Sequence, residues 1–229
     1  MFAQEKDMTT SGTKTFKLDV AEYIEEAFER CGLEARTGYD LRTAKRSLNL
    51  LLAEWANRGI NRWTIAQTTQ TVSGGVASYD LGAETIDILS AVVRRDGVDY
   101  SIERVSRDDF LSIPDKDTQA RVTQFYVDRQ ITPTLKVWPT PDNSTDQIIF
   151  DRLVRMDDAG AQTNTIQVPF RFYPALAAGL AYYISVKKVP QKTQLLKAIY
   201  EEEMLRAMEE DRDRASFMVQ PSVAYSWGL

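Results

Sequence analysis

Histidine is absent from this chain of 229 residues, and cysteine occurs only once, at Cys31. The absence of histidine removes the commonest general base, the usual metal ligand and the side chain that titrates near neutral pH. Catalytic mechanisms of the Ser-His-Asp and Cys-His types are therefore excluded. A lone cysteine cannot form an intrachain disulfide. Because Cys31 falls on the apolar stripe of a predicted helix, we expect a small buried side chain there.

Long apolar runs and glycine-rich phosphate loops are also missing. The longest apolar run, residues 173–186, contains Pro174 and Gly179 and is shorter than the roughly 20 residues that a membrane span needs. It predicts a buried helix. The N-terminus lacks the apolar segment of a signal peptide. Neither a GxGxxG nor a Walker A sequence occurs, and residues 73–75 (SGG) indicate a turn. We expect no membrane span and no cofactor.

Positive charge is in deficit, with 28 Lys and Arg against 33 Asp and Glu, a net charge of −5 and a pI of about 5.0. Proteins that grip nucleic acid over a broad surface need clustered cations facing the phosphates. A nucleic-acid regulator is therefore disfavoured. An acidic wall repels phosphate, so DNA could still slide past such a protein. The chain is long enough to bury roughly 70–75% of its unfolded surface in a real core.

Apolar residues recur at helical spacing near both ends of the chain. The clearest stripe lies between Asp40 and Arg58 and ends at Gly59; its members are Leu41, Ala44, Leu48, Leu51, Leu52 and Trp55. Asp19 and Glu22 have the spacing of a capping box, and Gly32 suits a helix C-terminus. The predicted helices are Asp19–Cys31, Asp40–Arg58, Ala175–Val186 and Gln191–Ser216. The first is acidic and the second basic, which favours an antiparallel pair.

From Trp63 to Val168 the apolar period changes to two. Asp96-Gly97 lies between β-rich runs and is a strong hairpin signal. The spacing of Ser106 and Asp109 predicts the start of a short helix. The predicted strands of a following meander are Val122–Arg129, Leu135–Trp138 and Gln147–Met156.

Together these patterns predict an α+β fold in which the N- and C-terminal helices form one bundle and an inserted β-rich domain, meander- or barrel-like, protrudes. We divide the chain into a flexible arm (1–17), a bundle domain (18–62 and 169–216), a β domain (63–168) and a C-terminal docking tail (217–229). The expected bundle core is Leu48, Leu51, Trp55, Leu180, Ile184 and Leu196.

No catalytic or metal site can be identified in the sequence. Residues 142–146 (DNSTD) resemble a calcium loop but lack its glycine and its bidentate glutamate, so a polar hairpin turn is the better interpretation. The carboxylates of Glu201-Glu202-Glu203 point in different directions on a helix and predict a solvated face. A hydrolase that uses a carboxylate pair remains an alternative without support.

The C-terminal tail carries aromatic residues outside any predicted helix. It either folds back on its own domain or anchors a partner, since Trp and Tyr are enriched at interface hot spots. As candidate contacts with a partner or a neighbouring subunit we name Phe217, Val219, Tyr225 and Trp227, together with Arg212 and Arg214.

Four segments give the chain a family resemblance: RSLNLLLAEWANRGINRWTI, VTQFYVDRQITPTLKVWPTPD, VPFRFYPALAAGLAYYISVKK and LLKAIYEEEMLRAMEEDRDRAS. In their order and combination they resemble the head-to-tail adaptor proteins of short-tailed bacteriophages. The resemblance implies a structural virion protein, made in the host cytoplasm, that docks beneath the portal protein as a dodecameric ring. Such a ring extends the DNA channel, lets packaged DNA pass without specific binding, and supports the tail nozzle and tail fibre proteins. A head-completion (stopper) or tail tube protein is the nearest alternative.

Overall fold

The computed structural model describes residues 11–34, 38–60 and 62–211. Its α-helices are α1 (Val20–Cys31), α2 (Gly38–Arg58), α3 (Arg107–Ser112), α4 (Tyr173–Lys188) and α5 (Thr193–Glu210). Short 3₁₀ helices are η1 (Arg62–Thr64), η2 (Phe170–Phe172) and η3 (Pro190–Lys192). The strands are β1 (Ile65–Thr71), β2 (Ser78–Asp80), β3 (Thr85–Arg95), β4 (Val98–Ser101), β5 (Glu103–Arg104), β6 (Gln124–Asp128), β7 (Thr134–Trp138) and β8 (Gln147–Val154).

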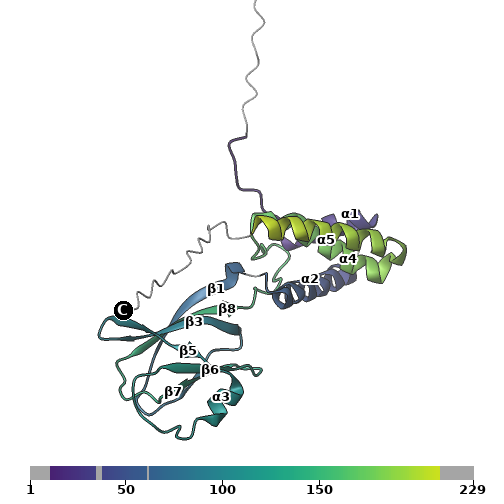
Figure 1. The fold of residues 1–229 in the computed structure, drawn as a ribbon. Helices are drawn as coiled ribbons and strands as arrows, with labels where there is room; N and C mark the ends of the chain where they lie inside the picture. The colour runs from purple at the N-terminus through teal and green to yellow at the C-terminus, as the bar shows by residue number, and fades with distance from the viewer. Residues whose placement is uncertain (1–10, 35–37, 61, 212–229) are drawn as a thin grey trace, which may run out of the picture.

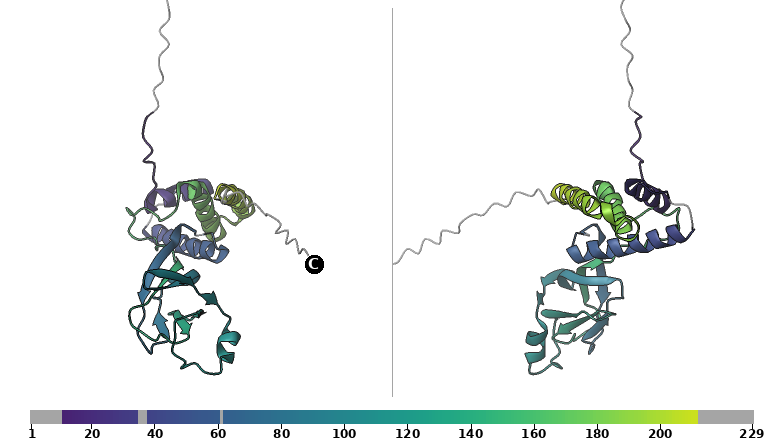
Figure 2. Two further views of the ribbon diagram at one scale, coloured as in Figure 1. Left: turned by 60° about the vertical axis from the view of Figure 1, so that its left-hand side comes forward. Right: turned by 90° about the vertical axis from the view of Figure 1, so that its right-hand side faces the viewer.

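Helices from both ends of the chain pack together at one end of the molecule (Figure 1). α4 lies between α1 and α5, and α2 lies beneath this layer, between it and the β-sheets (Figure 2). All six residues expected in the bundle core are buried, and the α+β class is confirmed. α1 packs chiefly against α4 and only lightly against α2, so the expected pairing of α1 with α2 does not organise the bundle. The apolar stripe of α1, which includes Tyr23, finds its main partner more than 140 residues away in the sequence.

The ends of α1 follow directly from its flanking residues. The Asp19 carboxylate accepts a hydrogen bond from the backbone N–H of Glu22 at 2.8 Å, and the Glu22 carboxylate accepts one from the N–H of Asp19 at 2.8 Å. This is the predicted capping box, which satisfies two N–H groups that the first turn leaves unpaired. Gly32 ends the helix with φ of 73°, a left-handed conformation that glycine adopts without steric cost.

Gly179 sets the distance between α4 and its neighbours. A Cβ atom added at this position would lie 2.9 Å from Leu51 Cδ2 and 2.9 Å from Tyr200 Cε2. Both contacts belong to buried side chains, one on α2 and one on α5. The missing side chain therefore lets three helices meet around one point.

Replacing Gly179 with valine should lower the free energy of unfolding by about 1–3 kcal/mol, because overpacking a filled core forces side chains from their preferred rotamers. Chemical denaturation measures this change. The matched control is Ala198→Val on the exposed face of α5, which tests the intrinsic effect of valine in a helix. Equal unfolding midpoints for the two variants would show that the space at Gly179 is not limiting.

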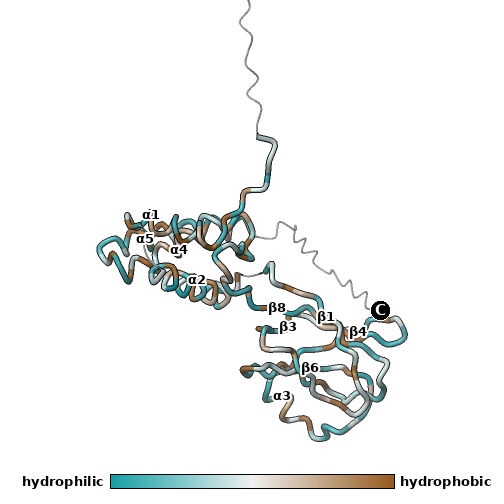
Figure 3. The backbone as a smooth tube through the Cα atoms, turned by 180° about the vertical axis from the view of Figure 1, so that it is seen from behind, coloured by the Kyte–Doolittle hydropathy of each residue, from teal (hydrophilic) through white to brown (hydrophobic). Residues whose placement is uncertain are grey.

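The β domain consists of two four-stranded sheets rather than a barrel-like closure in the part of the chain that is described. One sheet has the order β1-β8-β3-β4 and the other β2-β7-β6-β5, with a separate apolar core between them. β5 pairs with β6 in parallel, and the other pairs are antiparallel. Seen from behind, apolar and polar residues interleave along the elements of both the helical and the β region (Figure 3).

Turns and helix starts in the β domain were predicted better than the pairing of its strands. Asp96 and Gly97 have φ of 53° and 79° and connect β3 to β4, as the hairpin signal required. Ser106 caps α3 as expected. The predicted meander was wrong at its third strand, because β8 leaves β7 and pairs in the other sheet with β1 and β3. Trp63 lies in η1 rather than in a strand. The last helix ends at Glu210, so the predicted residues 212–216 lie outside the described part.

Candidate functional site

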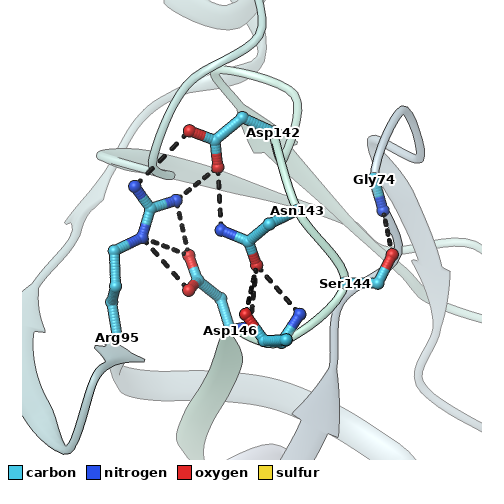
Figure 4. Close-up of polar contacts among 7 residues, drawn as sticks. Gly74, Arg95, Asp142, Asn143, Ser144 and Asp146 are labelled. Carbon is cyan, nitrogen blue, oxygen red and sulfur yellow. Dashed lines mark hydrogen bonds and ion pairs between the residues drawn. The ribbon is translucent and has the colours of Figure 1, made fainter.

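Arg95 closes one end of the β-sandwich by binding two carboxylates of the loop between β7 and β8 (Figure 4). Its Nε donates to both carboxylate oxygens of Asp146, at 2.9 and 3.1 Å, and its Nη2 donates to Asp142. The Asp146 side chain is only 4% exposed, so its charge needs this partner. Hydrogen bonding to Arg95 lowers the pKa of the more exposed Asp142 carboxyl.

The same loop is folded by Asn143, whose side-chain oxygen accepts hydrogen bonds from the N–H groups of Thr145 and Asp146, each at 2.9 Å. The Ser144 hydroxyl accepts one from the N–H of Gly74 at 3.0 Å, which ties the loop to the β1–β2 connection (Figure 4). The loop is therefore polar and turned, as expected, although it joins two sheets instead of forming a hairpin. Its carboxylates already hold a guanidinium, so it is not arranged as a calcium loop.

Two further carboxylates, one on β3 and one on β6, each bind two basic side chains. Asp87 accepts from Arg104 Nη2 at 2.9 Å and also pairs with Arg129. Asp128 accepts from Arg107 at 2.8 Å and from Lys136 at 3.1 Å. These pairs place a cation on each carboxylate, an arrangement that serves structure rather than acid–base chemistry. Among the described residues, no group of three His, Cys, Asp or Glu side chains is placed to hold a metal ion.

The acidic run of α5 behaves as a solvated helix face. Glu201 binds Arg58 through two hydrogen bonds of 2.9 Å, and Glu202 and Glu203 both pair with Arg206. Cys31 is buried as expected, and burial raises the pKa of its thiol. A thiol with a raised pKa is a poor nucleophile at neutral pH.

An exposed aromatic surface lies where the segment before α1 contacts the start of α4. Phe16 is 64% exposed and Phe170 is 69% exposed, and their rings lie 6.4 and 5.5 Å from that of Tyr173. A surface pocket of about 430 Å³ next to them has acidic α1 side chains on its rim; its lining includes Phe16, Leu18, Tyr173, Pro174 and Ala177, with Glu22, Glu25, Glu26 and Glu29. Large exposed aromatic residues of this kind are typical of surfaces that bind a partner.

Sequence reasoning missed this surface because Phe16 falls in the predicted arm and Phe170 beside a predicted helix start. The signal available was the aromatic density of residues 170–173 (FRFY) next to Pro169. Arg171, next to Phe170 in the sequence, pairs with Asp211, the last described residue. The predicted contact residues Arg212, Arg214, Phe217, Val219, Tyr225 and Trp227 all lie beyond Asp211, outside the described residues.

The ion pairs predict how stability depends on pH. Arginine or lysine partners lower the pKa values of Asp99, Asp128, Asp142 and Glu201. A lowered pKa in the folded state stabilises the protein above the unfolded pKa, near 4, and this stabilisation is lost as the pH falls through the folded values. Because histidine is absent, we expect a nearly constant Tm from about pH 5.5 to 8 and a steep fall below about pH 4. Thermal unfolding followed by circular dichroism tests this, and a marked Tm change between pH 6 and 7 would contradict it.

Comparison with known proteins identifies one family. Residues 15–224 match the model of the family described as SU10 adaptor protein. No curated protein matches the chain. In the described segments, no helix is both long and apolar enough to cross a membrane.

Proposed function

The chain belongs to the SU10 adaptor protein family, whose members are phage structural proteins, and on this premise we propose that it forms a ring between the portal and the tail. The ring, a dodecamer in our proposal, extends the DNA channel and supports the tail nozzle and tail fibre proteins. It acts by binding and catalyses no reaction.

The family match carries this proposal, because it covers all the described helices and strands. Two features of the chain support it. The buried carboxylates are engaged in ion pairs that join parts of the fold, and large aromatic side chains are exposed at one end of the bundle. Both features are compatible with a protein that acts by binding other proteins rather than by catalysis.

We assign the attachment of each subunit to its C-terminal tail. The contact residues are Phe217, Val219, Tyr225 and Trp227, with Arg212 and Arg214, and the acceptor is the portal or a neighbouring subunit. Burying an aromatic side chain contributes roughly 1.5–3 kcal/mol before ordering costs are subtracted. Repetition around a ring turns a small gain for each tail into strong avidity.

Mixing the full chain with purified portal rings tests the role. We expect the chain to sediment with the rings and to add one layer of density below the portal in electron micrographs. The β domains of the subunits should form a second tier of density, distinct from the helical bundles, that lies either on the side away from the portal or around the channel. Binding to tail tubes or to a completed neck, without binding to portal rings, would favour the stopper or tail tube alternative instead.

The channel role makes a prediction about DNA. With a net charge of −5, the ring should present a neutral or negative lumen and bind duplex DNA weakly, because close phosphate contacts need clustered cations. Fluorescence anisotropy with labelled duplex DNA at 50 and 200 mM salt measures this. Tight binding that weakens steeply with salt would contradict a neutral or negative channel wall.

A further inference from the structure

The free edge of β1 is an unfilled position in the first sheet. β1 pairs with β8 along residues 65–71 and ends the strand order β1-β8-β3-β4. No strand of the described residues pairs with its other edge. A free edge of this length presents a row of backbone N–H and C=O groups to any extended segment nearby.

This edge lacks the features that usually protect an exposed strand. No charged residue occurs from Trp63 to Tyr79, a run of 17 residues in a chain that is 27% charged. β1 contains no proline, and its register with β8 runs without a bulge from Ile65 to Thr71. Natural edge strands are normally protected by lysine, proline, a bulge or a covering element. β1 is therefore suited to accept another strand.

The described chain ends beside the start of this strand. Asp211 lines a surface pocket of about 320 Å³ together with Ile60 and Arg62. η1 follows at Arg62 and leads directly into β1 at Ile65. Asp211, the last described residue, thus lies next to the segment that leads into the start of β1.

The tail has the composition of a strand that would fit there. Residues 215–229 carry no charged side chain. Within them Val223, Tyr225 and Trp227 alternate with Ser222, Ala224 and Ser226. Alternation of large apolar residues with small ones is compatible with a β-strand that buries one face.

The chain between these points is long enough to reach. Residues 212–221 separate Asp211 from Ser222, and ten extended residues span up to about 33 Å. The seven residues of β1 extend over about 23 Å. The tail of a subunit can therefore reach any part of the β1 edge.

We propose that residues 222–227 add as a strand to the free edge of β1, so that the tail extends the first sheet by β-augmentation. Main-chain hydrogen bonds then supply the attachment, and the alternating Val223, Tyr225 and Trp227 side chains lie together on one face of the sheet. This inference names an acceptor for the tail and rests on the docking role proposed for it above.

Hydrogen exchange on the full chain, alone and bound to portal rings, tests the pairing. Ala224→Pro removes an N–H in the middle of the added strand and cannot disturb the fold of residues before 212 directly. Alternate N–H groups of β1 already point toward β8, so only those of residues 65–71 that point toward the free edge should exchange on the order of tenfold faster in this variant than in the parent chain. Ala215→Pro, in the same tail but outside the proposed strand, is the matched control and should leave these rates unchanged.

A second experiment tests the free edge of β1 itself by placing charged side chains on this strand. Gln67→Lys with Thr69→Lys puts two lysines on exposed positions of β1, and the tail amides should then exchange faster. Ser101→Lys on the opposite edge strand, β4, is the control. Protection that falls on fifty-fold dilution indicates the tail of a second copy, as the docking role requires. Protection that survives dilution indicates that a subunit's own tail fills the edge, which keeps the β1 pairing but contradicts docking on a neighbour.

Identical exchange at residues 65–71 in the parent chain and in Ala224→Pro, both free and on portal rings, would overturn the inference. The docking role is judged separately by deleting the tail. If deletion abolishes attachment while Ala224→Pro leaves β1 exchange unchanged, the tail binds elsewhere, such as on the portal, and only the acceptor is wrong.

Discussion

Replacing Trp55 with alanine is expected to lower the free energy of unfolding of the helical bundle by about 3–5 kcal/mol. The Trp55 side chain is fully buried, and its ring lies 5.6 Å from that of Phe172. Its Nε1–H donates to the Tyr200 hydroxyl at 2.9 Å, which in turn donates to Glu54 at 2.9 Å. Burial, together with the charge of Glu54, raises the pKa of Tyr200, so the hydroxyl keeps its proton. The substitution therefore leaves a large cavity and breaks a buried chain of hydrogen bonds.

The effect should be confined to one of the two apolar cores. The bundle core and the core between the sheets share no buried residue. Hydrogen exchange should therefore accelerate in α2 and α4 of Trp55→Ala while β8 is changed far less. Trp138→Ala is the matched control, because that side chain is only half-buried and belongs to β7. A uniform acceleration across both regions would show that they unfold as one unit.

Deleting residues 217–229 is expected to abolish attachment to portal rings while the melting temperature stays nearly unchanged. Every residue of the two described cores precedes Asp211, so the truncated chain retains them. The lost contacts include Phe217, Tyr225 and Trp227, whose combined burial on a partner should dominate the binding free energy. Sedimentation with portal rings and thermal unfolding measure the two effects on the same sample.

A variant with Arg212 and Arg214 both replaced by glutamine separates charge from apolar contact. It keeps the aromatic residues, so attachment should weaken modestly and lose part of its salt dependence. Unchanged attachment of the truncated chain would contradict the anchoring role of the tail. The exposed surface around Arg206 would then be the next candidate.

The helices could be predicted from sequence because their signals are local. The Asp19 carboxylate caps a helix whose apolar stripe starts at the next residue, and both features lie within a few positions of each other. The same holds for the Asp96-Gly97 turn, which requires positive φ at two adjacent residues. Such signals need no knowledge of distant parts of the chain.

The partners of the strands could not be predicted in the same way. β8 pairs with β1 across more than 75 residues, and nothing in its own sequence distinguishes that partner from β7. Arg95 and Asp146 are 51 positions apart, and only the folded sheets bring them within 2.8 Å. The exposed aromatic surface was missed for a similar reason, since Phe16 and Tyr173 are joined only by the packing of α1 on α4.

The strands lie between α2 and α4 in the chain, so the two apolar cores can form in a fixed order during translation. The strands of the β domain are complete once Val154 has left the exit tunnel, and they can close around their own core at that point. α1 and α2 are made before these strands, yet the helices that cover their apolar stripes end only at Glu210. α1 and α2 are therefore made before the β domain but buried after it, so the leucines of α2 and Trp55 stay uncovered while the strands are translated.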